Sequence, residues 1–279
     1  MKISIPLLIS LFVLFSPSVN AFDFFAFKKD NCHYETKAGM LHGAFSQKYS
    51  NGSIMVSGKF ENNQRVGTWN FYNFHGQLIE KRMYFNNYEY AIMNQEGKIL
   101  KQFNVNGKWD LIKSKNVKFQ HRLWKLVEKE SEGHLEIDKL VKSINNCDSG
   151  NFFSEERFIH KIDKTELANI TAIKIKEDYI YDNERESMFV RTLGIGLVNS
   201  NSETVAWIYY PDWMESFKKV KTTWHNDHLN RRTLHDVFTQ RAYNAKPYKL
   251  GKDKLKSKTI IELELEMVHQ ENMLIIAKA

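Results

Sequence analysis

Three stretches between residues 176 and 249 decide the fold of this part of the chain: KEDYIYDNERESMFVRTLGIGL at 176–197, WIYYPDWMESFKKV at 207–220 and WHNDHLNRRTLHDVFTQRAYNAKPYK at 224–249. Apolar and polar residues alternate through the first stretch and into the second, which is typical of strands. The alternation predicts three strands of an antiparallel sheet, at Thr171–Asp182, Ser187–Val198 and Glu203–Tyr210.

Helix signals follow these strands. Pro211 suits the first turn of a helix that would run through Val220. Thr233 is a good N-cap for a second helix, Leu234–Tyr243. The lysine-rich stretch that follows ends in IIELELEMVHQENMLII at 260–276, where alternation fits a strand but the Glu, Leu and Met content favours a helix.

Upstream of the strands, apolar residues recur at helical spacing. They predict a helix over Phe119–Val127 and another over Leu135–Ile144. A third, short helix is expected from Ser154 to Phe158.

An internal repeat occupies residues 43–109. GSIMVSGKFENN at 52–63 returns 24 residues later as GQLIEKRMYFNN at 76–87, and GKILKQFNVNG at 97–107 is a weaker third copy. Each copy begins with a glycine turn and continues as a strand, so the repeat predicts stacked β-hairpins. The residues GTWNFYNFHGQLIEKRMYFNN resemble MORN-type repeats, and their aromatic residues are expected to pack the sheet: Trp69, Phe71, Tyr72 and Tyr84.

Together these elements predict an α+β protein with an N-terminal antiparallel hairpin-repeat sheet and a small α+β domain. That domain would combine a three-stranded antiparallel sheet with packed helices. The expected boundaries are a signal peptide at 1–21, the repeat domain at 22–112, the α+β domain at 113–250 and a helical tail at 251–279.

The N-terminus has the pattern of a secretory signal peptide. Lys2 is followed by an apolar run, Ile3–Phe15, which is short for a bilayer span, and small residues precede a cleavage site after Ala21. No later segment is apolar enough to span a membrane, so we expect an exported chain located in the periplasm. The formal net charge of +7 is mild; an acidic protein or an anionic surface fits it better than nucleic acid.

No chemical motif stands out. Two histidines at His225 and His228 lack the further ligands that zinc requires, and the carboxylates near Glu177 and Asp182 give only a weak suggestion of a glycosidase. We therefore expect no enzyme activity, no metal and no cofactor, with a carboxylate hydrolase as the weakest alternative. Cys32 and Cys147 could pair in an oxidising compartment, but their spacing does not require it.

Many ordered positions are similar to the GldN/PorN family of gliding-motility and type IX secretion proteins. They include Lys176–Tyr179 with Leu193–Ile195, Trp207–Pro211, Asn226–Asp227 and the run from Arg231 to Arg241, and the resemblance covers roughly 118–249. It implies a non-catalytic periplasmic subunit that forms a large ring with a GldK/PorK-like outer-membrane lipoprotein and contacts a GldM/PorM-like motor shaft. Association with the outer membrane would then run through a partner.

The sequence departs from this family at Gly196–Leu197 and in the hairpin repeats, so a free adaptor whose hairpin sheet binds a cell-surface protein or anionic lipid remains the alternative. Because interfaces favour Trp, Tyr and Arg, the residues expected to face a partner are Trp207, Tyr209, Trp213, Asp227, Arg231, Arg232, Asp236 and Arg241.

Overall fold

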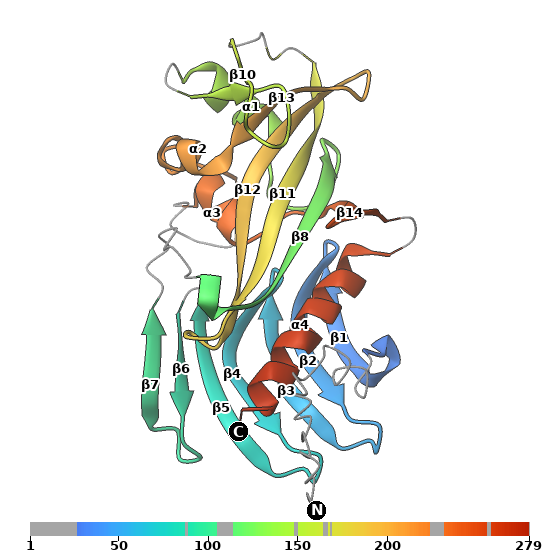
Figure 1. Ribbon diagram of the computed structural model, residues 1–279, viewed down its shortest axis with the longest axis vertical. Helices are drawn as coiled ribbons and strands as arrows, with labels where there is room; N and C mark the ends of the chain where they lie inside the picture. The colour runs from blue at the N-terminus through green and yellow to red at the C-terminus, as the bar shows by residue number, and fades with distance from the viewer. Residues whose placement is uncertain are drawn as a thin grey trace, which may run out of the picture.

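Two antiparallel sheets and one long helix form the body of the protein in the computed structural model (Figure 1). The structure describes residues 27–86, 89–104, 114–147, 150–163, 167, 169–223, 232–255 and 258–278. The expected signal peptide at 1–21 lies outside these residues. The predicted α+β class is confirmed.

The first sheet is a seven-stranded meander in which each strand pairs with its neighbour in sequence. A short 3-10 turn, η2 (Lys29–Asn31), precedes it. Its strands are β1 (Cys32–Lys37), β2 (Met40–Lys48), β3 (Ile54–Glu61), β4 (Gln64–Tyr72), β5 (Leu78–Asn86), β6 (Glu89–Met93) and β7 (Ile99–Asn104).

Three turns of this sheet share one hydrogen-bonding pattern. In each turn the amide of a glycine, Gly52, Gly76 or Gly97, donates to the carbonyl three residues before it. All three glycines have φ between +78° and +88°, a conformation that L side chains rarely adopt. The predicted glycine turns are therefore present, while a MORN-type repeat remains a prediction.

The second sheet has eight strands in the order β10-β9-β13-β12-β11-β8-β14-β15. The three predicted strands are central in it, and five more extend the sheet on both sides, so the expected three-stranded sheet was too small. A second 3-10 turn, η3 (Ser114–Asn116), precedes it. The strands are β8 (Val117–Glu128), β9 (Phe152–Phe153), β10 (Lys161–Ile162), β11 (Ile170–Asp182), β12 (Ser187–Asn199), β13 (Thr204–Tyr209), β14 (Lys246–Leu250) and β15 (Asp253–Lys254).

Strand β8 replaces the helix predicted over Phe119–Val127, and that prediction was wrong. Leu123, Trp124 and Lys125 are all buried because β8 is covered on both faces. A strand buried on both faces lacks the alternation that marks a half-buried strand, so its apolar run also fits a helix. The short helix predicted from Ser154 to Phe158 is likewise absent, and a turn stands in its place.

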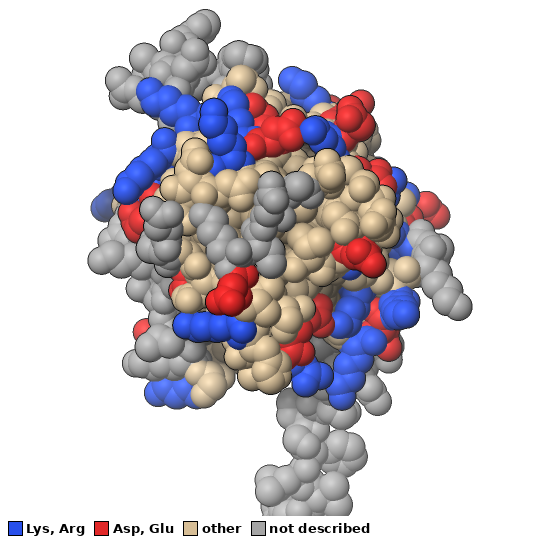
Figure 2. Space-filling model, turned by 90° about the horizontal axis from the view of Figure 1, so that it is seen from above, with Lys and Arg blue, Asp and Glu red and all other residues tan. Residues whose placement is uncertain are grey.

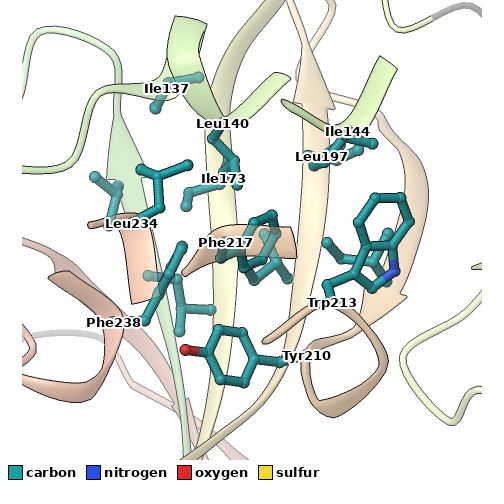
Figure 3. Close-up of a cluster of buried hydrophobic side chains, with 14 of the residues drawn as sticks. Ile137, Leu140, Ile144, Ile173, Leu197, Tyr210, Trp213, Phe217, Leu234 and Phe238 are labelled. Carbon is teal, nitrogen blue, oxygen red and sulfur yellow. The ribbon is translucent and has the colours of Figure 1, made fainter. Parts of the chain in front are cut away.

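Three short helices cover one face of the second sheet. They are α1 (Ile137–Asn145), α2 (Tyr210–Phe217) and α3 (Leu234–Thr239), all near their predicted positions. Pro211 lies in the first turn of α2, and Thr233 caps α3 through a reciprocal capping box with Asp236. Figure 3 shows their apolar side chains packed on Ile173 of β11 and Leu197 of β12.

The last helix, α4 (Ile260–Ile276), belongs to both halves of the molecule. Thr259 and Glu262 form a capping box at its start. The helix lies across the first sheet (Figure 1) and packs Leu265 and Val268 into that sheet's core. Leu263 and Met267 pack instead on Leu123 and Tyr179 of the second sheet. The predicted helix is present, but it is part of the fold rather than a tail.

Candidate functional site

The buried carboxylate of Glu264, on α4, is the centre of an ion network between the two sheets. Both of its oxygens accept from Arg241 at 2.6 Å, and one also accepts from the Tyr179 hydroxyl at 2.5 Å. The ammonium of Lys125 lies 3.3 Å away. A second guanidinium nitrogen of Arg241 donates to the carbonyl of Asn63, in the turn between β3 and β4, at 2.9 Å. The network therefore ties the first sheet, the second sheet and α4 together.

Charge compensation keeps Glu264 ionised. Burial alone would raise the pKa of this carboxyl group, but the charges of Arg241 and Lys125 outweigh burial and lower it to about 2. Because the ionised form is the one that binds its neighbours, the network is intact across the neutral pH range.

The carboxylates considered for catalysis have structural partners. Glu177 is fully buried, lies 2.7 Å from the Lys125 ammonium and accepts from the Tyr243 hydroxyl. Asp182 is also fully buried and accepts from Arg185 at 2.5 Å and from the amide of Glu184 at 2.9 Å. Both groups serve the packing of the second sheet.

The second half of α4 repeats this arrangement against the first sheet. Glu271 lies 2.9 Å from the Arg65 guanidinium of β4 and accepts from the amide of Met188 in β12 at 2.9 Å. Arg65 also donates to Asn272 at 2.7 Å, and Asn272 donates to Gln47 at 3.2 Å. Glu264 and Glu271 are two turns apart, so one side of the helix holds both arginines.

The turn between β11 and β12 makes another contact with the first sheet. Arg82 of β5, whose side chain is fully buried, donates to the carbonyl of Glu186 at 2.7 Å. Tyr90 of β6 donates to the carbonyl of Arg185. The tip of the β11–β12 hairpin is thereby held against the first sheet.

A cavity of about 50 Å³ remains where these contacts meet. Its lining includes Arg65, Arg241, Glu264, Glu271 and Ser187. The Nε atom of Arg241 is buried and has no hydrogen-bond partner among the residues that the structure describes. A polar space of this size suits ordered water molecules that would accept from that nitrogen.

The opposite face of the second sheet carries rings and lysines. Trp124, Phe153 and Trp207 form a cluster there with Phe158, Tyr209 and Tyr248. The Lys249 ammonium lies 4.0 Å from the ring centre of Trp124, and that of Lys176 lies 5.0 Å from the ring centre of Phe158. We call this surface the outer face.

Two glycines of β12 make room for the rings. A Cβ at Gly194 would collide with the ring of Phe158, and one at Gly196 would press on Trp207. Phe158 belongs to the segment Ser154–His160, which crosses the outer face and which we call the strap. The strap is fixed by Glu156, whose carbonyl accepts from Lys176 at 2.7 Å and whose carboxylate accepts from Lys249 at 3.0 Å.

The residues predicted to face a partner are scattered in the structure. Trp213 is 0%, Trp207 5% and Arg241 6% exposed, so these three side chains belong to the interior and were wrongly placed on a surface. Tyr209 is half-buried on the outer face. Arg232 bonds Gln240, Asp236 caps α3, and Asp227 and Arg231 lie outside the described residues.

The possible disulfide is not formed. Cys32 packs at the edge of the first sheet's core, whereas Cys147 packs against the helices of the second sheet and lies 3.6 Å from the Ser216 hydroxyl. The two thiols therefore belong to separate cores. Burial raises the pKa of the Cys32 thiol to about 11.

Residues that hold the two sheets together were missed at the sequence level. Lys125, Glu264 and Glu271 come from segments that are distant in sequence, and nothing in a single sequence pairs them. One signal was available: Glu264 and Glu271 are spaced by two turns in the helix predicted at 260–276, which places both on the same side of it.

Metal and membrane features are limited in the part of the chain that the structure describes. There, His, Cys, Asp and Glu do not gather in groups of three or more that could bind an ion. His225 and His228 lie outside the described residues. No described helix combines the length and apolar character that crossing a membrane requires. In the view of the molecule from above, Lys, Arg, Asp and Glu surround a largely uncharged central area of the surface (Figure 2).

Comparison with known proteins assigns the chain to a family. Among curated proteins, none matches the chain significantly. The family model described as "Gliding motility associated protein GldN" matches residues 34–278, which include α4 and both sheets except for the first two residues of β1. The match extends well beyond the 118–249 region in which the resemblance was first seen. The chain therefore belongs to the GldN family of gliding motility associated proteins.

Proposed function

We propose that this protein is a non-catalytic structural subunit of the gliding machinery that acts by assembling with other proteins. One observation carries the proposal: buried charged groups form a chain of ion pairs between the two sheets, in the order Glu177, Lys125, Glu264 and Arg241. Groups used in this way hold a body rigid, and rigidity is what a subunit needs to transmit force. Membership of the family supports the same role.

The proposal includes a location and partners. Export through a signal peptide cleaved after Ala21 would place the protein in the periplasm, where it serves type IX secretion and gliding. Its partners would be a GldK/PorK-like outer-membrane lipoprotein and a GldM/PorM-like motor shaft, in a ring or other homo-oligomer. The protein would approach the outer membrane through the lipoprotein.

Purification from cells tests this proposal. The complete chain, tagged at its C-terminus, is isolated from solubilised membranes, and co-purifying proteins are identified by mass spectrometry. We expect the lipoprotein and the shaft protein. If the protein is recovered without either of them under conditions that preserve the lipoprotein–shaft complex, the proposal is wrong.

A second candidate is an adaptor that binds a cell-surface partner or anionic lipid through the first sheet, which we propose to be built from MORN-type hairpins. The observation in its favour is apolar exposure: Phe85 of β5 is 49% exposed, and Ile99 and Leu100 of β7 are 49% and 65% exposed. Exposed apolar patches often mark binding surfaces.

Deleting residues 43–109 does not separate the two candidates, because the first sheet is where α4 packs. The double substitution Phe85→Glu/Ile99→Glu changes only exposed side chains. If the adaptor role is correct, this variant loses surface binding while it still co-purifies with the lipoprotein and the shaft protein. Unchanged surface binding in the folded variant rules out the adaptor role of these exposed side chains.

A further inference from the structure

Lysines gather at the end of the outer face that the strap leaves open. Leu126 of β8 pairs with Lys174 of β11 on one side and with Lys246 of β14 on the other, so the three side chains project from the same face. The Lys174 ammonium lies 5.9 Å from the ring centre of Tyr248. We call Leu126, Lys174, Lys246 and Tyr248 the lysine face.

Among the described residues, few carboxylates lie near these ammonium groups. Lys174 donates to the hydroxyl of Thr204 at 2.7 Å, which is a neutral partner. The carboxylate of Glu156 accepts from Lys249, and Lys176 donates to the backbone carbonyl of the same residue. Lys246 pairs with Glu128, but both side chains are at least half exposed, so that bond is weak and easily exchanged.

The electrostatics of Lys176 agree with an excess of positive charge. Burial lowers the pKa of this ammonium, and the nearby charges of Arg122 and Lys249 lower it further. The acidic groups that face it, Glu156 and Asp178, do not reverse the shift. Asp178 is itself held by Arg122 in a two-pronged ion pair.

The chain's own strap shows which chemistry this face accepts. Glu156 supplies a carboxylate to Lys249, and two residues later Phe158 supplies a ring that lies over Gly194 and contacts Tyr209 at 5.2 Å between ring centres. An acidic side chain followed by an aromatic one therefore fits the occupied half of the outer face. The lysine face offers the same combination of cations and rings, and its side chains are exposed or half-buried.

We propose that the lysine face binds an acidic segment of a partner protein. Carboxylates of the segment would pair with Lys174 and Lys246, and an apolar side chain would pack on Tyr248 and Leu126. A protein segment is favoured over a lipid surface because the half-buried Lys174 beside the Tyr248 ring can recognise an individual side chain, whereas headgroup binding needs only exposed charge. This inference rests on the proposed function, since it names the chemistry of one assembly contact.

The test compares two double variants with the same change in charge. In Lys174→Glu/Lys246→Glu the lysine face is reversed, and in Lys48→Glu/Lys59→Glu two exposed lysines of the first sheet are reversed. The probe is a fluorescein-labelled nine-residue peptide, three repeats of Glu-Glu-Phe, measured by anisotropy. We expect binding to weaken at least tenfold in the first variant and to stay within twofold of the unaltered protein in the second. Urea denaturation confirms that both variants fold.

Three results would overturn the inference. The first is that the unaltered folded protein does not bind the peptide, and the second is that both variants bind it equally weakly. The third is that the lysine-face variant binds the peptide normally and loses only its binding to phosphatidylglycerol vesicles, measured in parallel. Co-purification from membranes separates this inference from the proposed function. If the lysine-face variant still recovers the lipoprotein and the shaft protein at the level of the control, the acidic contact is wrong and the structural role stands. If the unaltered protein recovers neither, the structural role itself fails.

Discussion

At the scale of single residues, one carboxylate on α4 determines how the halves of the molecule meet. Glu264 bonds Arg241, lies close to Lys125 and accepts from Tyr179, and all four side chains are buried. Removing one member of a buried ion network leaves the others charged and unpaired in a poorly solvated place. The stability of the protein should therefore depend strongly on this residue.

We expect Glu264→Gln to lower the free energy of unfolding by about 3–5 kcal/mol, the usual cost of breaking a buried ion pair. The matched control is Glu266→Gln on the same helix, whose partner Lys258 is 46% exposed, so its loss should cost below about 1 kcal/mol. Urea denaturation measures both. Equal effects of the two substitutions would show that the network contributes little.

The same carboxyl group predicts a dependence of stability on pH. Its pKa is lowered from 4.5 to about 2 in the folded protein, so the unfolded chain binds the proton more readily. The stability that the ionised Glu264 carboxylate contributes is therefore fully present above pH 4.5 and is lost as pH falls towards about 2. Unfolding measured at a series of pH values should show a smaller loss across this window in Glu264→Gln than in the unaltered protein. Identical slopes would contradict the assignment.

Single-residue reasoning from sequence was least successful at the interface. Interfaces favour Trp and Arg, but the same residue types also occur in cores and in buried ion networks. Trp207, Trp213 and Arg241 are buried in this way. A sequence does not show which helix covers which face of a sheet. Cys32 and Cys147 were undecided for the same reason, since their distance depends on how the two halves pack.

At the scale of elements, the sequence predicts helix starts and turns well where these depend on neighbouring residues alone. Thr233 and Thr259 both accept from the third amide of a helix and begin α3 and α4. The glycine turns at Gly52, Gly76 and Gly97 follow from backbone conformation alone. The prediction at β8 failed because this strand is buried on both faces and therefore lacks the alternation that identifies a strand.

The strap gives a test at this scale. In Gly194→Ala the new Cβ meets the ring of Phe158, so we expect a loss of about 1–3 kcal/mol and faster tryptic cleavage at the exposed Arg157. Adding Phe158→Ala removes the collision and should make the glycine substitution nearly neutral. If Gly194→Ala costs the same with and without the Phe158 ring, the ring does not depend on the glycine.

At the scale of the whole molecule, α4 makes the two sheets one unit. Its residues fill the core of the first sheet and also pack on β8 and β11, while the tip of the β11–β12 hairpin contacts Arg82 and Tyr90. The predicted domain boundary at 250/251 falls inside the β14–β15 hairpin. The partners of α4 are far from it in sequence, which explains why the helix was predicted but its place was not.

This arrangement predicts a single cooperative unfolding transition for residues 22–279. Calorimetry should give one peak, and the calorimetric enthalpy should equal the van't Hoff enthalpy, because α4 fills part of the first sheet's core and also packs on β8 and β11 of the second sheet. Two separated transitions would show that the sheets are independent and that α4 does not join them.

The central claim is that this rigid body acts by assembly, and reconstitution tests it most directly. Residues 22–279 are co-produced with the proposed lipoprotein partner and the periplasmic part of the proposed shaft protein, and the mass of the purified species is measured by native mass spectrometry. We predict a stable complex that contains multiple copies of this chain together with the lipoprotein. A folded chain that is recovered only as a monomer, beside a lipoprotein and shaft that assemble without it, would contradict the claim.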